Sequence, residues 1–148
     1  MGMIIQTDLG NIQQIKIEKM RLLYREGPHD VASQQKIWPT FEAHFPSLTG
    51  RKMFGFDYGD QKLYRACSLV LESDQGETFG LKQFEFEGGN YLRLRLKFDP
   101  PELFDKIGPA YQFLFSQYDE QINWSQPSVE HYKAKNILDV MIPVNNGL

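Results

Sequence analysis

The feature of this sequence that most restricts its fold is a proline inside each of two amphipathic helical segments, which lie about 70 residues apart. Proline in a helix interior costs about 3 kcal/mol, so its presence at the same place in both segments indicates an internal repeat. The residues that correspond at an offset of 70 are Ile37, Pro39, Phe41 and Phe45 in the first segment and Ile107, Pro109, Tyr111 and Phe115 in the second. Those that correspond at an offset of 74 are Tyr58 with Tyr132 and Val70 with Val144. The repeat predicts halves of about residues 12–73 and 83–145 within a single domain of residues 1–148.

Alternation of apolar and polar residues predicts strands on both sides of each helix. The strand regions are residues 15–25 and 54–72 in the first half and 84–98 and 130–144 in the second, each broken by turn residues. Each half is therefore expected to contain a β-hairpin, a helix and a second β-hairpin. At Pro39 we expect either a kink or a fresh helix start.

These elements predict an α+β fold in which two duplicated βαββ units are related by a pseudo-two-fold axis. The sheet should be predominantly antiparallel, with the two principal helices on one side. Neither half has a sheet wide enough to be secure alone, so pairing of the halves supplies the width. A ligand groove is expected between the halves, because pockets favour interfaces between substructures.

Charge and cysteine content exclude several classes of protein. The 16 Lys and Arg residues against 19 Asp and Glu residues give a net charge of −3, whereas a general nucleic-acid binder needs a basic surplus. Direct nucleic-acid binding is therefore not expected. The single cysteine, Cys67, excludes an intramolecular disulfide and a cysteine-rich zinc module, and it is expected to be buried and structural.

The sequence shows no targeting, metal-binding or catalytic signature. Residues 1–6 lack the features of a signal peptide, and no apolar run approaches the ~18 residues of a membrane span, so we expect a cytoplasmic protein without a membrane partner. His29, His44 and His131 are scattered, so neither a metal site nor a cofactor is expected. Asp57 and Asp60 are interpreted as ordinary turn residues.

One strand carries an alternating basic edge made of Arg93, Arg95 and Lys97. This edge could meet phosphate, but the preferred interpretation is the solvated face of a half-buried strand. Glu85 and Glu87 are spaced so that they would neutralise it from a neighbouring strand.

The C-terminal segments QPSVEHY (residues 126–132) and LDVMIPV (138–144) resemble the GyrI-like small-molecule-binding domains, which share the fold of the effector-binding domains of AraC-type and multidrug-sensing regulators. The first half carries the matching segments YREGP (24–28) and GFDY (55–58). Together these segments extend the resemblance over about residues 12–144. The second half departs from the family pattern at residues 98–100, where Phe-Asp-Pro replaces Gly-Pro.

The resemblance implies a central groove that binds hydrophobic, often cationic, small molecules. The characteristic glutamate of the family maps onto Glu130, whose buried carboxylate an organic cation could compensate while rings stack on its flat body. Alternatively, Glu130 pairs with a nearby Lys or Arg, or with backbone. Trp38 and Tyr111, beside the two helix prolines, either open onto a cavity or belong to the core. The expected ligand-binding residues are Glu130, Trp38, Tyr111, Phe56, Tyr58, Tyr132 and Phe41, with Phe56 and Tyr58 facing Glu130 across the pseudo-two-fold axis.

Three functional hypotheses follow. The leading one is a stand-alone binding protein for a hydrophobic or cationic small molecule such as a drug or effector, acting as a monomer or homodimer without an attached DNA-binding unit. The second is a small-molecule hydrolase in which Glu130, with Tyr132 or Tyr58, activates water. The third is a protein-interaction module, which predicts a large exposed apolar patch outside the groove.

Overall fold

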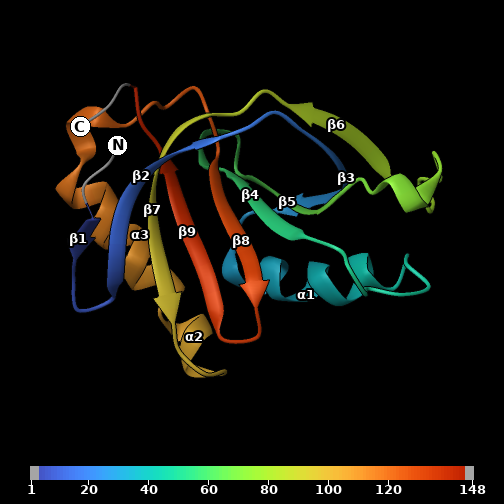
Figure 1. The fold of residues 1–148 in the computed structure, drawn as a ribbon, viewed down its shortest axis with the longest axis horizontal. Coiled ribbons are helices and arrows are strands. Elements are labelled where there is room, and N and C mark those ends of the chain that lie inside the picture. Colours follow the sequence, from blue (N-terminus) through green and yellow to red (C-terminus); the bar gives the residue numbers. More distant parts are fainter. Residues whose placement is uncertain (1–3, 146–148) are drawn as a thin grey trace.

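A nine-stranded antiparallel sheet forms the body of the computed structural model, which describes residues 4–145, and its helices lie on one face of that sheet (Figure 1). Residues 1–3, part of the segment considered for a signal peptide, and residues 146–148 lie outside the described range. The strands are β1 (Ile4–Gln6), β2 (Gly10–Ile17), β3 (Met20–Pro28), β4 (Met53–Tyr58), β5 (Leu63–Leu69), β6 (Lys82–Phe86), β7 (Gly89–Lys97), β8 (Ser128–Ala134) and β9 (Ile137–Pro143). The helices are α1 (Val31–Glu42), α2 (Glu102–Asp105) and α3 (Ile107–Gln117).

The strand order shows the duplication. Across the sheet it runs β1-β2-β7-β9-β8-β4-β5-β3-β6. If β2 is equated with β6, β3 with β7, β4 with β8 and β5 with β9, the order from β2 to β6 reads the same in both directions. The pseudo-two-fold axis passes between β4 and β8, which pair at the centre. The predicted α+β fold with two symmetric units is confirmed.

The expected hairpin at the start of each half is wrong. β2 pairs with β1 and β7 rather than with β3, while β3 pairs with β5 and β6. Each half therefore gives its first strand to the sheet of the other half. The exchange is stabilised by burial, because Ile12 of β2 enters the core beneath α3, among residues of the second half.

The two matching prolines occupy different positions in their helices. Asp30 caps α1, accepting a hydrogen bond of 2.9 Å from the backbone N–H of Ser33, and Pro39 lies well inside that helix. In the second half the chain forms α2, then begins α3 anew at Ile107, so Pro109 falls in a first turn. A first-turn residue has no intrahelical acceptor for its N–H, so proline is tolerated there.

Apolar side chains form three clusters. One lies between α3 and strands β7 and β9, another between α1 and strands β3 and β5, and the third covers the face of the sheet away from the helices. Cys67 belongs to the third cluster and is fully buried, as predicted. Burial raises the pKa of its thiol well above the usual value. No helix within residues 4–145 is long and apolar enough to cross a membrane.

Candidate functional site

Glu130 lies at the centre of the sheet, on the face that carries the helices. It sits on β8 directly opposite Gly55 of β4, and only 2% of its surface is exposed. Three tyrosine hydroxyls donate hydrogen bonds to its carboxylate. Tyr132 and Tyr64 donate to Oε1 at 2.7 and 2.9 Å, and Tyr111 donates to Oε2 at 3.1 Å.

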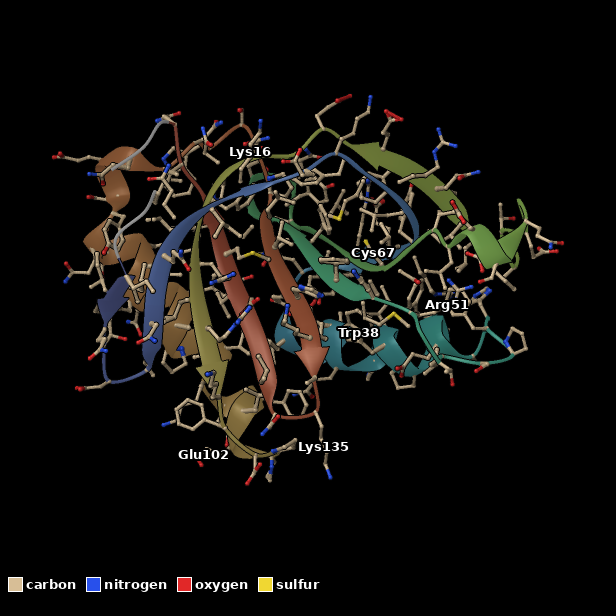
Figure 2. The ribbon with its side chains drawn as sticks, in the orientation of Figure 1. Lys16, Trp38, Arg51, Cys67, Glu102 and Lys135 are labelled. Atoms are coloured by element: carbon tan, nitrogen blue, oxygen red, sulfur yellow. The ribbon has the colours of Figure 1, made fainter. Side chains whose placement is uncertain are left out.

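These donors come from both halves of the molecule. Tyr64 is on β5 in the first half, whereas Tyr111 is on α3 and Tyr132 on β8 in the second. Trp38 of α1 completes the cluster, donating its Nε1–H to the Tyr64 hydroxyl at 3.2 Å and packing its ring 5.0 Å from that of Tyr132. Trp38 lies between α1 and the sheet (Figure 2). The cluster therefore joins the two halves beneath their helices.

The Glu130 carboxylate has no basic partner. Within residues 4–145, no Lys, Arg or His side chain lies within the 4.0 Å of an ion pair to it. Burial raises the pKa of Glu130, and the three tyrosine hydrogen bonds act in the opposite direction. Burial and the nearby carboxylate together raise the pKa of Tyr64 and Tyr111, which keeps both hydroxyls available as donors.

Gly55 makes room for this cluster. A Cβ atom at position 55 would lie 2.1 Å from the Tyr64 hydroxyl oxygen and 2.7 Å from Oε1 of Glu130. Only glycine avoids both contacts, so the centre of the sheet is shaped around the carboxylate and its donors.

A groove of about 530 Å³ opens beside the cluster, between the two halves. One wall consists of rings from the second half. Tyr111 stacks on Phe115 at 6.0 Å between centroids, and Phe115 stacks on Trp124 at 5.7 Å with the planes only 9° apart. Trp124 is 66% exposed. The other wall comes from the first half and includes His29, Asp57, Gly59 and Asp60.

Tyr111 is the link between the groove and the cluster, since its ring lines the groove and its hydroxyl binds Glu130. Glu130 itself is not among the groove-lining residues.

Asp57 supplies a carboxylate to the groove wall. It is the fifth residue of β4, opposite Ser128, and its side chain is 25% exposed. Its Oδ1 lies 3.5 Å from Nδ1 of His29 and accepts no hydrogen bond from any residue that the structure describes. Burial raises its pKa, with His29 acting in the opposite direction. The interpretation of Asp57 as an ordinary turn residue is therefore wrong, because it belongs to a strand and faces the groove.

Known proteins with this architecture were found by comparison of structures. An integron cassette protein of Vibrio cholerae has a TM-score of 0.70 at 15% identity, covering 90% of this chain and 95% of that one. SAV2435, solved bound to tetraphenylphosphonium, has a TM-score of 0.66 at 14% identity, with 91% and 94% covered. The C-terminal domain of EcmrR has a TM-score of 0.63 at 10% identity, with 91% and 97% covered. The chain has the GyrI-like effector-binding fold.

This likeness establishes the fold alone. A hydrolase from Listeria innocua matches the same GyrI-like fold less closely, with a TM-score of 0.53 at 15% identity and 90% and 91% covered. No protein-family model matches the sequence, and comparison with curated proteins found no significant match.

Within this GyrI-like fold, the structure brings together four of the residues that the sequence singled out. Trp38, Tyr111, Tyr132 and Glu130 form one cluster, and the two helices supply Trp38 and Tyr111 as expected. Phe41 does not join them. It is fully buried beneath α1, packed edge-on against Trp38 and Phe45.

The expected positions of Phe56 and Tyr58 are wrong. Both lie in the cluster on the opposite face of the sheet. The repeat alignment placed Tyr58 against Tyr132, an offset of 74, but the axis at Gly55 and Glu130 relates residues of β4 and β8 that are 75 apart. A shift of one residue turns every side chain of a strand to the other face.

Three residues of the site escaped the sequence analysis. Tyr64 sits in an apolar strand pattern that does not distinguish a hydroxyl donor from a core ring. Phe115 was considered as the repeat counterpart of Phe45, and Trp124 was not singled out, yet they form the aromatic wall of the groove. The exposed stacking of two rings about nine residues apart is set by how α3 and the following loop fold together.

Proposed function

We propose that this protein binds hydrophobic, cationic small molecules in the groove between its halves. The observation that carries the proposal is a buried carboxylate, Glu130, with no basic partner in the described residues, directly behind the aromatic wall of a groove. A buried negative charge without a cation is costly, and an organic cation in the groove would compensate it. Asp57 on the facing wall adds a second, more accessible carboxylate.

The aromatic wall suits the apolar part of such a ligand. Flat faces of Tyr111, Phe115 and Trp124 offer both apolar area and the negative ring faces that attract cations. Stacking and dispersion tolerate many shapes, which favours loose specificity. The tetraphenylphosphonium bound to SAV2435, a protein of the same fold, supports this class of ligand.

Two ions of the same shape and opposite charge test the proposal. Isothermal titration calorimetry should show saturable binding of tetraphenylphosphonium, with tetraphenylborate binding at least about tenfold more weakly because it meets Asp57 and Glu130 with like charge. Asp57→Asn should weaken tetraphenylphosphonium about twofold to fivefold, as for a partly exposed ion pair.

The control for Asp57→Asn is Asp105→Asn on exposed α2, which removes the same charge away from the groove and should leave the affinity unchanged. Equal affinity for the two ions, or no binding of either, would contradict the proposal.

A second candidate function is hydrolysis of a small molecule. The observation in its favour is that Glu130 accepts hydrogen bonds from tyrosines, an arrangement suited to a carboxylate that activates water. The fold shared with the Listeria hydrolase also supports it. Against it, Glu130 does not line the groove, so Tyr111 stands between the carboxylate and a ligand.

Release of p-nitrophenol from p-nitrophenyl acetate tests this second candidate. A hydrolase should lose activity about 100-fold or more in both Glu130→Gln and Tyr132→Phe. Wild-type protein no faster than buffer, or variants as active as wild type, would exclude catalysis of this ester by Glu130.

No specific observation favours the interaction-module hypothesis. Among residues 4–145, the large exposed apolar side chains come from five different segments, and Trp124 belongs to the groove. They are Ile4, Val31, Leu48, Phe104 and Trp124.

A further inference from the structure

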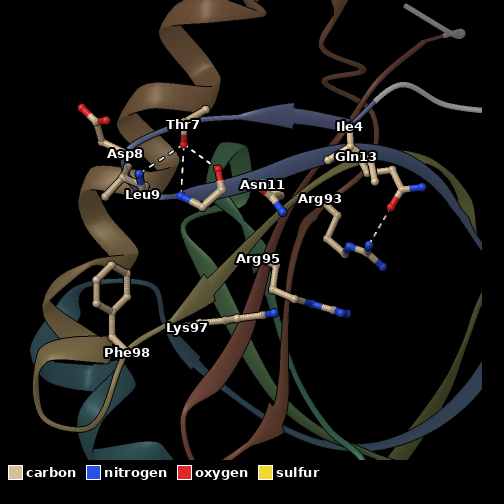
Figure 3. A pocket seen from close by; sticks show the side chains of 11 residues that line it. Ile4, Thr7, Asp8, Leu9, Asn11, Gln13, Arg93, Arg95, Lys97 and Phe98 are labelled. Carbon is tan, nitrogen blue, oxygen red and sulfur yellow. Dashed lines mark hydrogen bonds between the residues drawn. The ribbon is translucent and has the colours of Figure 1, made fainter.

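A second groove, of about 470 Å³, lies at the far edge of the sheet from α1, along β1, β2 and β7. Arg93, Arg95 and Lys97 point from β7 to the same side of the sheet and form its basic wall (Figure 3). Alternation along β7 places them on the face away from the helices, since Leu92, Leu94 and Leu96 lie in the core beneath α3.

The basic wall is not neutralised in the way the sequence suggested. Glu85 and Glu87 lie at the opposite edge of the sheet, on and beside β6. Their carboxylate oxygens are 2.7 and 3.9 Å from Nζ of Lys19. Among the residues that the structure describes, only Arg95 of this wall has an acidic partner, a forked pair with Asp139 at 2.7 and 2.9 Å.

Arg93 and Lys97 have no acidic partner in the described part of the chain. Arg93 donates from Nη2 to Oε1 of Gln13 at 2.9 Å, while its Nε is buried and has no hydrogen-bond partner among residues 4–145. Within residues 4–145, no carboxylate lies within 4.0 Å of the charged nitrogens of Arg93 or Lys97. No carboxylate of the described residues therefore compensates the positive charges of Arg93 and Lys97 on this wall.

The rest of the groove is shaped to take a molecule against this wall. The turn of residues 7–10, which closes the groove, is fixed by the side chain of Thr7. The Thr7 hydroxyl donates a hydrogen bond to the carbonyl of Gly10 at 2.7 Å and accepts from the N–H groups of Leu9 and Gly10 (Figure 3). Leu9 and Phe98 add apolar surface, and Asp8 is the one acidic residue among those that line the groove. The lining therefore combines three cations, one acid and an apolar side.

We propose that this groove binds the oxyanion of a small organic molecule, a carboxylate or a phosphate, through Arg93 and Lys97. The planar guanidinium matches both groups with paired hydrogen bonds. A bound oxyanion would accept hydrogen bonds from the guanidinium of Arg93 and the ammonium of Lys97, while the apolar part of the molecule rests on Leu9 and Phe98. This site is separate from the groove beside Glu130, and its charge preference is the opposite.

Nuclear magnetic resonance of the arginine Nε–Hε groups tests the proposal directly. The probes are phenyl phosphate and benzoate, added to the whole chain, and the Arg93 signal is identified by its loss in Arg93→Gln. We expect a saturable shift of that signal with at least one probe, and the tighter of the two identifies the preferred head group.

Charge-removing variants supply the controls, with binding followed on the backbone amides of residues 7–13. Arg93→Gln should weaken the probe about tenfold, as for loss of one charge-assisted hydrogen bond. Lys97→Gln, at an exposed position where folding is not at risk, should weaken it about threefold. Arg21→Gln, which removes the same charge from an exposed position on β3, should have no effect. No saturable shift with either probe, or equal losses in all three variants, would overturn the proposal.

Discussion

Replacing Gly55 by alanine should lower the free energy of unfolding by about 3 kcal/mol, the sum expected for overpacking a core and disturbing a buried hydrogen bond. The added Cβ would sit 2.1 Å from the Tyr64 hydroxyl and 2.7 Å from Oε1 of Glu130. Neither atom is the free end of a flexible surface side chain, because the two are hydrogen-bonded to each other in the interior. Urea denaturation followed by circular dichroism measures the loss, which corresponds to a midpoint temperature lower by about 6–12 °C.

Gly108 offers a matched control for this substitution. It lies in α3, and a Cβ there would meet nothing within 4 Å. Gly108→Ala should therefore leave the stability unchanged or raise it by up to about 1 kcal/mol. Removing the Tyr64 hydroxyl should lower the free energy of unfolding less in Gly55→Ala than in wild type, because it also removes the close contact with the added Cβ. A Gly55→Ala protein as stable as wild type would show that the centre of the sheet adapts, and that glycine is not required there.

Replacing Glu130 by glutamine should weaken tetraphenylphosphonium binding by about 5-fold to 150-fold, or 1–3 kcal/mol, and leave its neutral relative triphenylphosphine oxide almost unaffected. The carboxylate is buried where water screens little, and no basic side chain of the described residues neutralises it. Glutamine keeps the shape of the side chain and removes only the charge. Calorimetric titration of both ligands at pH 8 measures the difference.

The pH dependence separates charge from shape in the same experiment. Burial raises the pKa of Glu130 above its ordinary value, so the wild-type side chain loses its charge at a higher pH than a free glutamate does. The difference between wild type and Glu130→Gln should therefore shrink as the pH falls through that pKa. Equal loss for the cation and the neutral ligand would mean that Glu130 shapes the groove. Glu85→Gln, on the surface of β6, serves as the control for net charge.

The strands and helices of this fold were predictable from sequence, but the pairing of the strands was not. Alternating residues mark the strands and show which face is buried, as in Leu92, Leu94 and Leu96 of β7. Alternation says nothing about which strand lies alongside. Only Glu18 and Lys19 separate β2 from β3, and so short a link is typical of a hairpin. Burial of Ile12 in the core of the second half instead favours the pairing of β2 with β7. This contact joins residues that are far apart in the sequence.

The site was predictable to the extent that it depends on local patterns. Glu130 and Tyr132 were identified through the motif around them, and Trp38 and Tyr111 through the helix prolines. Strand register decided the rest. The register of β4 and β8 differs by one residue from the repeat alignment. Phe56 therefore lies on the other face of the sheet, and Gly55 lies opposite Glu130. Tyr64 reaches the carboxylate from β5, and no local pattern in the sequence links these two residues.

The crossing of β2 and β6 between the halves bears on how the chain reaches its native state. Gly10 pairs with Leu96, and Met20 with Phe86, so the outer strands of each half find their partners only after most of the chain is available. Contacts of such sequence separation raise contact order and slow folding. During synthesis on the ribosome, one edge of β3 stays unpaired until β6 has emerged. We therefore expect neither half to fold independently, and we expect the central carboxylate cluster, which takes donors from both, to form only when the two halves pack together.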